Sequence, residues 1–348
     1  MARIIGVGTA LPGNFYNKAD IQNIGRRWLE GRNTSLELFQ RFVSSAQNDA
    51  RYFSVDAEEI LSLNGLQHRA DLFEREAPLL GARSLGQAIS KAGIAPSEIS
   101  SFLFTSCSLP SIPAVDALII EKSGMPRTVR RLPIYQHGCA GGVIGLGLAH
   151  QLTNGSGPVA LTSVELCSLV FHNNDDSPAQ LVGAAIFGDG SASVIVDERK
   201  DGLQIVAVES FLVPNSRHLM GYDTFDDGFH LRLDRQLPGE LAAAAPQRVV
   251  SFLKAHNLKV EDVSYWLFHP GGVKILDSLE RSLSIEPARA RWAREVLSEI
   301  GNLSSATVLF VLERFLDSGT VSDGDKVVML GVGPGLTIEL ILMEYLGS

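Results

Sequence analysis

Three residues of this chain carry groups that together could perform thioester chemistry. Cys139 lies in a glycine-rich segment from Gly138 to Gly142, His269 ends an apolar run, and Asn302 follows Gly301. A cysteine acts as a nucleophile in its thiolate form, which helix N-terminal amides and a nearby imidazolium favour. An imidazole and a carboxamide on one side of the thiolate would supply two hydrogen-bond donors for an enolate or a tetrahedral oxyanion.

Each of these residues also has an ordinary structural interpretation. Cys139 could be a buried packing residue, His269 a hydrogen-bonded core histidine, and Asn302 a helix cap. The glycines around Cys139 favour a catalytic role, since they leave room for a substrate. The three residues are more informative as a group, provided that the fold brings them together.

An internal repeat supplies the elements that would position them. Residues 91–104 resemble residues 254–268 at an offset of 163 to 164, and the same offset aligns 138–142 with 301–305. In both copies a capped helix end leads into a short apolar run, which ends at Thr105 in one and at His269 in the other and is typical of a buried strand. Pseudosymmetry would therefore bring Cys139 and Asn302 together at the centre.

The pattern of strands and helices predicts an α/β fold with buried sheets. We expect helices over 143–152 and 306–316, and strands over 159–165 and 326–330. The predicted halves are 1–200, which carries the cysteine, and 201–348, which carries the histidine and the asparagine. No repeat is visible between 1–70 and 201–250.

Composition narrows the classes of function. A net charge of −9 and a pI near 5.4 argue against binding nucleic acid or an anionic membrane surface. With no signal-peptide pattern and no apolar run of about 18 residues, the chain is expected to be cytoplasmic and not inserted in a membrane. The cysteines, Cys107, Cys139 and Cys167, form no CxxC pair, so neither a disulfide framework nor a zinc site is predicted.

Several motifs resemble those of the type III polyketide synthases, the chalcone synthase family. The likeness is specific from about residue 98 to 345 and weaker before that. The motifs are Gly138-Cys139, FGDG at 187–190, HPGGVKILD at 269–277, GNLSSA at 301–306 and GVGPGLTIE at 331–339.

The resemblance implies a duplicated, thiolase-like αβαβα layered fold and a homodimer. It also implies a reaction in which an acyl starter passes from coenzyme A, or from an acyl carrier protein, to Cys139. Malonyl-CoA then loses carbon dioxide to an enolate held by His269 and Asn302, and the enolate attacks the Cys139 thioester. Repeated extension and cyclisation to an aromatic or pyrone product follow, with no metal or organic cofactor.

The resemblance implies further site residues at positions that match those of the family. Phe187 and Phe229 match the two gatekeeping phenylalanines, although either could be ordinary aromatic core, and Ile112 would reach into the partner subunit's cavity. Residues implied for the cavity wall are Cys107, Ser108, Glu165, Cys167, Val170, Gly183, Gly221 and Ser304. Residues implied for coenzyme A binding are Arg41, Gly271, Gly272 and Lys274.

Departures from the family pattern leave some roles open. Cysteine at 107 and 167 resembles the bacterial members, and all three thiols would face one cavity. For Glu165 a hydrogen-bonded structural role is at least as well supported as a catalytic one. His137 occupies a position that is usually neutral, where it is either a packed polar side chain, the interpretation we favour, or a group that tunes the thiolate.

Three alternative functions were weighed. A single-condensation ketosynthase, of the β-ketoacyl synthase III kind, uses the same Cys-His-Asn set, but the paired phenylalanines and the turn at 333–335 favour a polyketide synthase. A non-catalytic dimeric scaffold is disfavoured because all three polar groups are retained. A papain-like hydrolase does not suit the duplicated buried helices.

Overall fold

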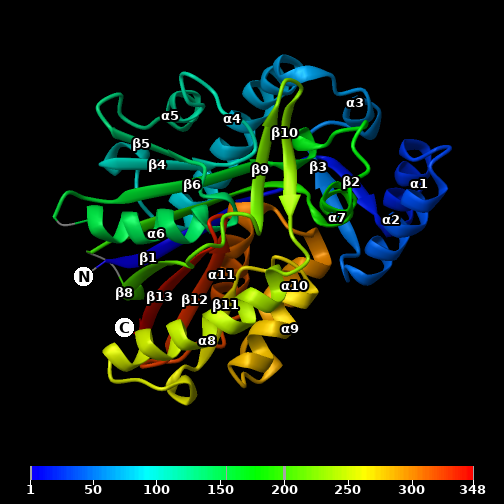
Figure 1. Ribbon diagram of the computed structural model, residues 1–348. Coiled ribbons are helices and arrows are strands. Elements are labelled where there is room, and N and C mark those ends of the chain that lie inside the picture. Colours follow the sequence, from blue (N-terminus) through cyan, green and yellow to red (C-terminus); the bar gives the residue numbers. More distant parts are fainter. Residues whose placement is uncertain (1, 154, 199–200, 348) are drawn as a thin grey trace.

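The structure is a computed structural model that describes residues 2–153, 155–198 and 201–347 (Figure 1). Within these residues nine strands form one mixed sheet, in the order β11-β12-β13-β8-β1-β7-β6-β4-β5. Their bounds are β1 (Arg3–Ala10), β4 (Ser101–Ser106), β5 (Arg130–Tyr135), β6 (Val159–Leu166), β7 (Asp189–Asp197), β8 (Gly202–Leu212), β11 (Tyr265–Phe268), β12 (Lys326–Gly333) and β13 (Thr337–Leu346).

The order and direction of the strands show the duplication. In the first half β4 runs parallel to β6, and β6 antiparallel to β7; in the second, β11 runs parallel to β12, and β12 antiparallel to β13. The halves meet where β1 pairs with β8, at Arg3↔Gln204 and Ile4↔Leu203. Thus β1 and β8 correspond as well, although their sequences show no repeat.

Two buried helices lie between the halves. Helix α6 (Gly141–Leu152) contacts β4 and β6 of its own half and also β12 and β13 of the other. Helix α11 (Thr307–Asp317) contacts β11 and reaches β1 and β7. At Gly142 a Cβ atom would lie 2.3 Å from the carbonyl oxygen of Ser305, so glycine is what allows the two helix starts to approach this closely.

The remaining helices cover the outer faces. Helix α4 packs on β1, β6 and β7, and α8 packs on α9 and β13. Their bounds are α1 (Lys18–Trp28), α2 (Asn33–Ser45), α3 (Ala57–Leu61), α4 (Gly65–Ala92), α5 (Asp116–Ser123), α7 (Pro178–Ile186), α8 (Leu237–Ala255), α9 (Val273–Ser282) and α10 (Arg291–Ile300). No helix in the described part of the chain is long and apolar enough to span a bilayer.

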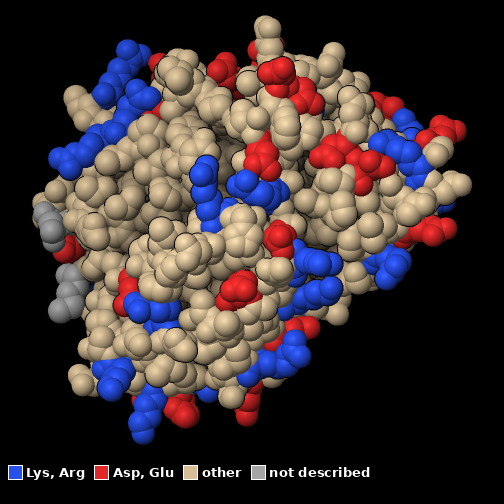
Figure 2. All heavy atoms as spheres, in the orientation of Figure 1, with Lys and Arg blue, Asp and Glu red and all other residues tan. Residues whose placement is uncertain are grey.

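Two small ribbons lie outside the main sheet. Strands β2 (Asn14–Asn17) and β3 (Ala50–Phe53) pair near α1, and β9 (Met220–Phe225) with β10 (Gly228–Leu233) forms a hairpin that rises across the first half (Figure 1). At the edge of the main sheet, β5 carries the exposed Arg130 and Arg131. Figure 2 shows basic side chains gathered at the upper left, where Figure 1 places α5 and β5. Charges of this kind discourage pairing with another sheet edge.

The predicted α/β elements are present, with revised ends. Short 3₁₀ turns, η2 (Gly138–Ala140) and η6 (Ser304–Ala306), precede α6 and α11. Cys139 therefore lies in a turn before its helix, and Asn302 lies outside any helix. Strand β12 continues to Gly333, three residues beyond its predicted end, because residues 331–333 pair with β13.

Candidate active site

The position of Cys139 depends on a close contact between its turn and the loop after β12. Gly138 has φ +51°, and a Cβ atom there would lie 2.4 Å from Cδ of Pro334. A side chain at 138 would therefore displace the turn. This contact explains why Gly138 and the Gly-Pro-Gly segment at 333–335 occur together.

The backbone and the side chain of Asn302 are both fixed. Its N–H donates to the carbonyl of Ile186 at 2.9 Å. Its Oδ1 accepts from the N–H of Ser304 at 2.8 Å and from Oγ1 of Thr307 at 3.2 Å, while Nδ2 donates to the carbonyl of Gly271 at 3.4 Å. The acceptor is thus occupied by donors from η6 and α11, and the amide donor points toward the loop that follows β11.

His269 is the first residue after β11 and is 3% exposed. Its backbone N–H donates to the carbonyl of Leu330 at 2.8 Å. Within the described residues neither ring nitrogen has a hydrogen-bond partner, although both are buried. Burial lowers the pKa of His269 to about 4, so the ring is neutral.

A chain of contacts connects the three residues. The Sγ atom of Cys139 lies 3.5 Å from Oγ of Ser304, whose N–H is bound by Asn302. Asn302 in turn binds Gly271, two residues after His269. In the described part of the chain the thiol and the imidazole share no direct hydrogen bond, and neither His269 nor Asn302 is among the residues that line the cavity at Cys139.

Burial sets the resting protonation state of Cys139. Burial raises the pKa of the Cys139 thiol to about 11, against a smaller lowering by the hydrogen bond with Ser304. The ring of His269 is neutral as well, so it supplies no imidazolium that could offset the cost of burial. Desolvation is therefore the largest effect on the pKa of the resting thiol.

A second thiol lies beside the first. The Sγ atom of Cys107 is 3.1 Å from Oγ of Ser304, so the two cysteines share one hydroxyl. Burial and then the charge of Glu165 raise the pKa of Cys107 well above its ordinary value. Cys107 is therefore a neutral neighbour of the nucleophile candidate.

Glu165 is fully buried in β6 and satisfied by hydrogen bonds. It accepts from Oγ of Ser108 at 2.5 Å, from the N–H of Cys107 at 3.1 Å, and from the hydroxyl of Ser305. These bonds link the segment after β4, strand β6 and the turn η6. The contacts support the structural interpretation of Glu165, and Ser108 is buried beside it.

A cavity of about 160 Å³ opens at Cys139. Six of the predicted residues line it: Cys107, Cys139, Phe187, Gly221, Phe229 and Ser304. Seven further residues line it that were not predicted from the sequence: Gln136, Met220, Tyr222, Thr224, Leu231, Leu233 and Pro334. Most of these come from the β9–β10 hairpin, and the alternation of apolar and polar residues over 220–233 was the signal that a ribbon lies there.

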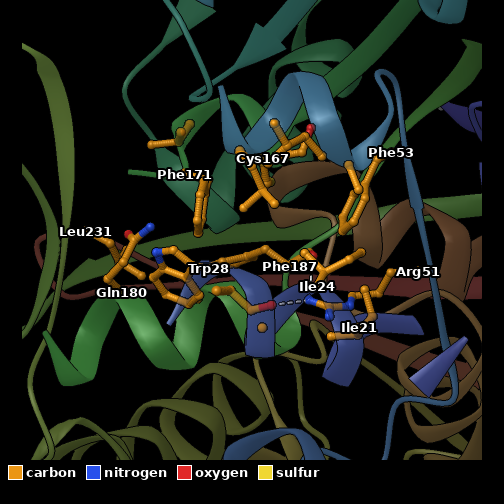
Figure 3. Close-up of a pocket in the computed structure, with 18 of the residues that line it drawn as sticks. Ile21, Ile24, Trp28, Arg51, Phe53, Cys167, Phe171, Gln180, Phe187 and Leu231 are labelled. Atoms are coloured by element: carbon orange, nitrogen blue, oxygen red, sulfur yellow. Dashed lines mark hydrogen bonds between the residues drawn. The ribbon is translucent and has the colours of Figure 1, made fainter. Parts of the chain in front are cut away.

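The three thiols do not all face this one cavity. Cys167, Val170 and Gly183 line a neighbouring apolar pocket of about 80 Å³, which shares Phe187, Tyr222 and Leu231 with the first (Figure 3). Its wall also includes Phe171 and, from the part of the chain before residue 98 where the motifs are weaker, Ile21, Ile24, Trp28 and Phe53. Arg51, also in the wall, donates to the carbonyl of Phe187 at 3.3 Å.

The remaining predicted residues lie near the surface. Ile112 is 98% exposed on the loop after β4. Arg41 of α2 and Lys274 of α9 line one surface cleft of about 830 Å³, and Gly271 and Gly272 form the turn before α9.

His137 is exposed directly before Gly138. Burial nevertheless lowers the pKa of His137, and the two interpretations, a packed polar side chain and a group that tunes the thiolate, both stay predictions.

Comparison with known proteins shows similarity over the whole chain. Residues 1–199 and 204–347 match the N-terminal and C-terminal domains of the chalcone and stilbene synthases. The chain is 30% identical to phloroglucinol synthase of Pseudomonas fluorescens, over 89% of this chain and 90% of that protein. It is also 30% identical to 1,3,6,8-tetrahydroxynaphthalene synthase of Streptomyces coelicolor, over 88% and 83% respectively.

Solved structures agree with this result. The crystal structure of tetrahydroxynaphthalene synthase from Streptomyces coelicolor, described as a bacterial type III polyketide synthase, superimposes with a TM-score of 0.95. The sequences are 27% identical, and the match covers 99% of this chain and 100% of that one. The predicted thiolase-like α/β fold is thereby confirmed.

Proposed function

Because this chain belongs to the chalcone and stilbene synthase family, whose members are type III polyketide synthases, we propose that Cys139, His269 and Asn302 perform its decarboxylative condensation. The chain is an acyltransferase-type condensing enzyme that extends a starter with malonyl-CoA. A single-condensation ketosynthase is not favoured, since the relatives are polyketide synthases.

The proposed reaction begins with a proton transfer. The neutral ring of His269 accepts the proton of the Cys139 thiol as the thiolate attacks the starter thioester, and the departing thiolate takes that proton. Malonyl thioester then loses its carboxylate as carbon dioxide. The enolate oxygen accepts hydrogen bonds from a ring N–H of His269 and from Nδ2 of Asn302, and the enolate carbon displaces Cys139 from its acyl group.

The observation that carries this assignment is the unpartnered imidazole. Buried polar atoms nearly always have a hydrogen-bond partner, and leaving one without costs about 1–3 kcal/mol. His269 has two such nitrogens within the described residues. A thioester or enolate oxygen would supply the missing partner, whereas a structural histidine would already have one.

The lining of the second pocket supports a starter with an apolar tail. Ile21, Ile24 and Trp28 of α1 line it together with Phe171 and Leu231, and the rings of Trp28 and Phe171 are in edge contact at 4.8 Å between centroids (Figure 3). The starter's acyl tail would pass Phe187 and Tyr222, which the two cavities share. We propose coenzyme A as the donor, with Arg41 and Lys274 binding its phosphates, and an acyl carrier protein as the alternative.

The enzyme is proposed to act as a cytoplasmic homodimer. The exposed Ile112 would be covered by the partner subunit, where it would close that subunit's cavity, since a large apolar side chain at 98% exposure favours burial in an interface. Sedimentation analysis of the parent and of Ile112→Asp tests this, because a charge at the interface would shift the dimer toward monomer.

Labelled malonyl-CoA and a panel of acyl-CoA starters test the proposed function. Parent protein should release more than one carbon dioxide per product, and mass spectrometry should detect an acyl group on the tryptic peptide that contains Cys139. One carbon dioxide per product would support a ketosynthase. A Cys139→Ala variant with parental condensation activity would refute the assigned nucleophile.

A further inference from the structure

The β9–β10 hairpin forms a wall of the reaction cavity but does not belong to the main sheet. Gly221 and Tyr222 of β9 and Phe229 of β10 all line the cavity. A two-stranded ribbon is marginally stable by itself, so its position depends on side-chain contacts with the rest of the protein.

At the tip of the hairpin, His230 lies between two carboxylates. Its Nδ1 is 3.1 Å from Oδ2 of Asp175, on the loop before α7, and its Nε2 is 2.9 Å from Oδ1 of Asp227 on the hairpin turn. Ionised carboxylates only accept hydrogen bonds, so both contacts are satisfied when both ring nitrogens carry protons. The ring then is a cation between two anions, and it joins the hairpin to the protein body.

A second histidine is stacked on the first. The ring of His172 lies 3.9 Å from that of His230 between centroids, with 23° between the planes. Its Nε2 donates to the carbonyl of Phe229 at 3.1 Å, since a carbonyl can only accept. The remaining nitrogen, Nδ1, faces Nη2 of Arg69 at 3.4 Å and Oδ2 of Asp227 at 3.5 Å.

Burial and a neighbouring positive charge keep His172 in this form. Burial, and next the positive charge of Arg69, lower the pKa of His172 to about 4. Arg69 comes from α4 and is itself fixed, since Nη1 donates to the carbonyls of Leu169 and Phe171 at 2.6 Å each. His172 therefore presents a stable N–H to Phe229.

The same residues do not suit a metal ion. His172, Asp227 and His230 do have ligand atoms within 4.8 Å of one another. Imidazole lone pairs lie in the ring plane, however, and two nearly parallel stacked rings cannot direct them at one point. The guanidinium of Arg69 beside His172 would also repel a cation.

We propose that His172, His230, Asp175 and Asp227 are positioning residues that fix the hairpin and thereby set which acyl starters pass Phe229. The contact is direct, because His172 donates to the carbonyl of Phe229 itself. The neighbouring Gly228 is also close to this histidine, since a Cβ atom there would lie 3.3 Å from the ring of His172. The specificity part of this proposal rests on the proposed function, whereas the fixing of the hairpin does not.

Hydrogen exchange of the full-length protein, followed by mass spectrometry, tests whether these residues hold the β9–β10 hairpin in position. Asp175→Asn keeps the shape of the side chain and removes one charge, and His230→Gln removes the cation. Both should accelerate amide exchange over 220–233 roughly tenfold and leave β12 unchanged. Asp175→Glu, which keeps the charge, should restore at least part of the protection.

Arg232→Gln is the matched control. Arg232 pairs with Asp223 at 2.6 Å, and both residues lie on the hairpin, so the pair does not join the hairpin to the body. Exchange over 220–233 should change less than twofold in this variant. An equal acceleration in the control would overturn the proposal, because any lost ion pair would then suffice.

Steady-state kinetics test the specificity. In Asp175→Asn the ratio of kcat/KM for long to short acyl-CoA starters should change at least fivefold, while malonyl-CoA decarboxylation falls much less. If amide exchange over 220–233 is the same as in the parent in both Asp175→Asn and His230→Gln, these residues do not fix the hairpin. If exchange is faster but the ratio of kcat/KM values is unchanged, the hairpin does not set starter specificity. If His230→Gln does not fold, Asp175→Asn decides alone. Absence of condensation by the parent would refute the proposed function and leave the exchange result valid.

Discussion

Replacement of Gly142 by alanine tests whether the contact between the two central helices sets the geometry of the site. The new Cβ would lie 2.3 Å from the carbonyl oxygen of Ser305 and 3.2 Å from Cγ1 of Val308. Ordinary contacts begin at 3.4 Å, so the helix starts must separate by about 1 Å. Overpacking of this kind costs about 1–3 kcal/mol of unfolding free energy, against a gain of about 1 kcal/mol from the helix propensity of alanine.

The larger effect should appear in catalysis. Ser305 follows Ser304, which contacts Cys139, and lies three residues after Asn302. A displacement of about 1 Å there would misalign the thiol with the proposed oxyanion donors, at a cost of roughly 100-fold in condensation rate. Urea unfolding and the rate of carbon dioxide release from malonyl-CoA measure the two effects separately.

Gly147→Ala on the same helix is the control. Its Cβ would meet Cγ1 of Val208 at 3.4 Å, an ordinary contact, so this variant should keep its activity and gain about 0.5–1 kcal/mol of stability. Parental activity of Gly142→Ala would refute the reasoning. An equal loss of activity in Gly147→Ala would refute it as well, since the loss would then arise from helix propensity and not from the contact between Gly142 and Ser305.

Three further predictions concern the buried groups of the site. Cys139→Ala should lower product formation about 10³-fold or more, whereas Cys107→Ala should retain most of the turnover, as measured with one starter. Burial holds the pKa of His269 near 4, below its unfolded value of about 6.5, so the free energy of unfolding should fall as the pH drops from 6.5 to 4. In His269→Gln the difference between the unfolding free energies at pH 7 and pH 5 should be smaller than in the parent. Glu165→Gln should lower the free energy of unfolding, measured in urea, by about 2–4 kcal/mol, because one acceptor oxygen is lost where Ser108, Ser305 and Cys107 donate. An unchanged free energy of unfolding would show that these bonds are dispensable.

Several features of this protein could be read from the sequence alone. The repeat offset that pairs Cys139 with Asn302 follows from local patterns of apolar, capping and small residues, and the duplicated α/β fold follows from that repeat. Gly138 and Gly142 belong to the same pattern, since each meets the other half of the fold at a distance that excludes a side chain. Local patterns of this kind persist in a sequence because close packing tolerates few alternatives.

Tertiary structure decided the charges and the shape of the site. The neutral thiol of Cys139 and the neutral ring of His269 result from burial by segments far apart in the chain, and no motif encodes the desolvation that this burial causes. The separation of Cys167 from the other two thiols depends on where Phe187 and the hairpin lie. The hairpin is held by His172 and Asp175 against His230, contacts that span more than 50 residues and leave no periodic signal.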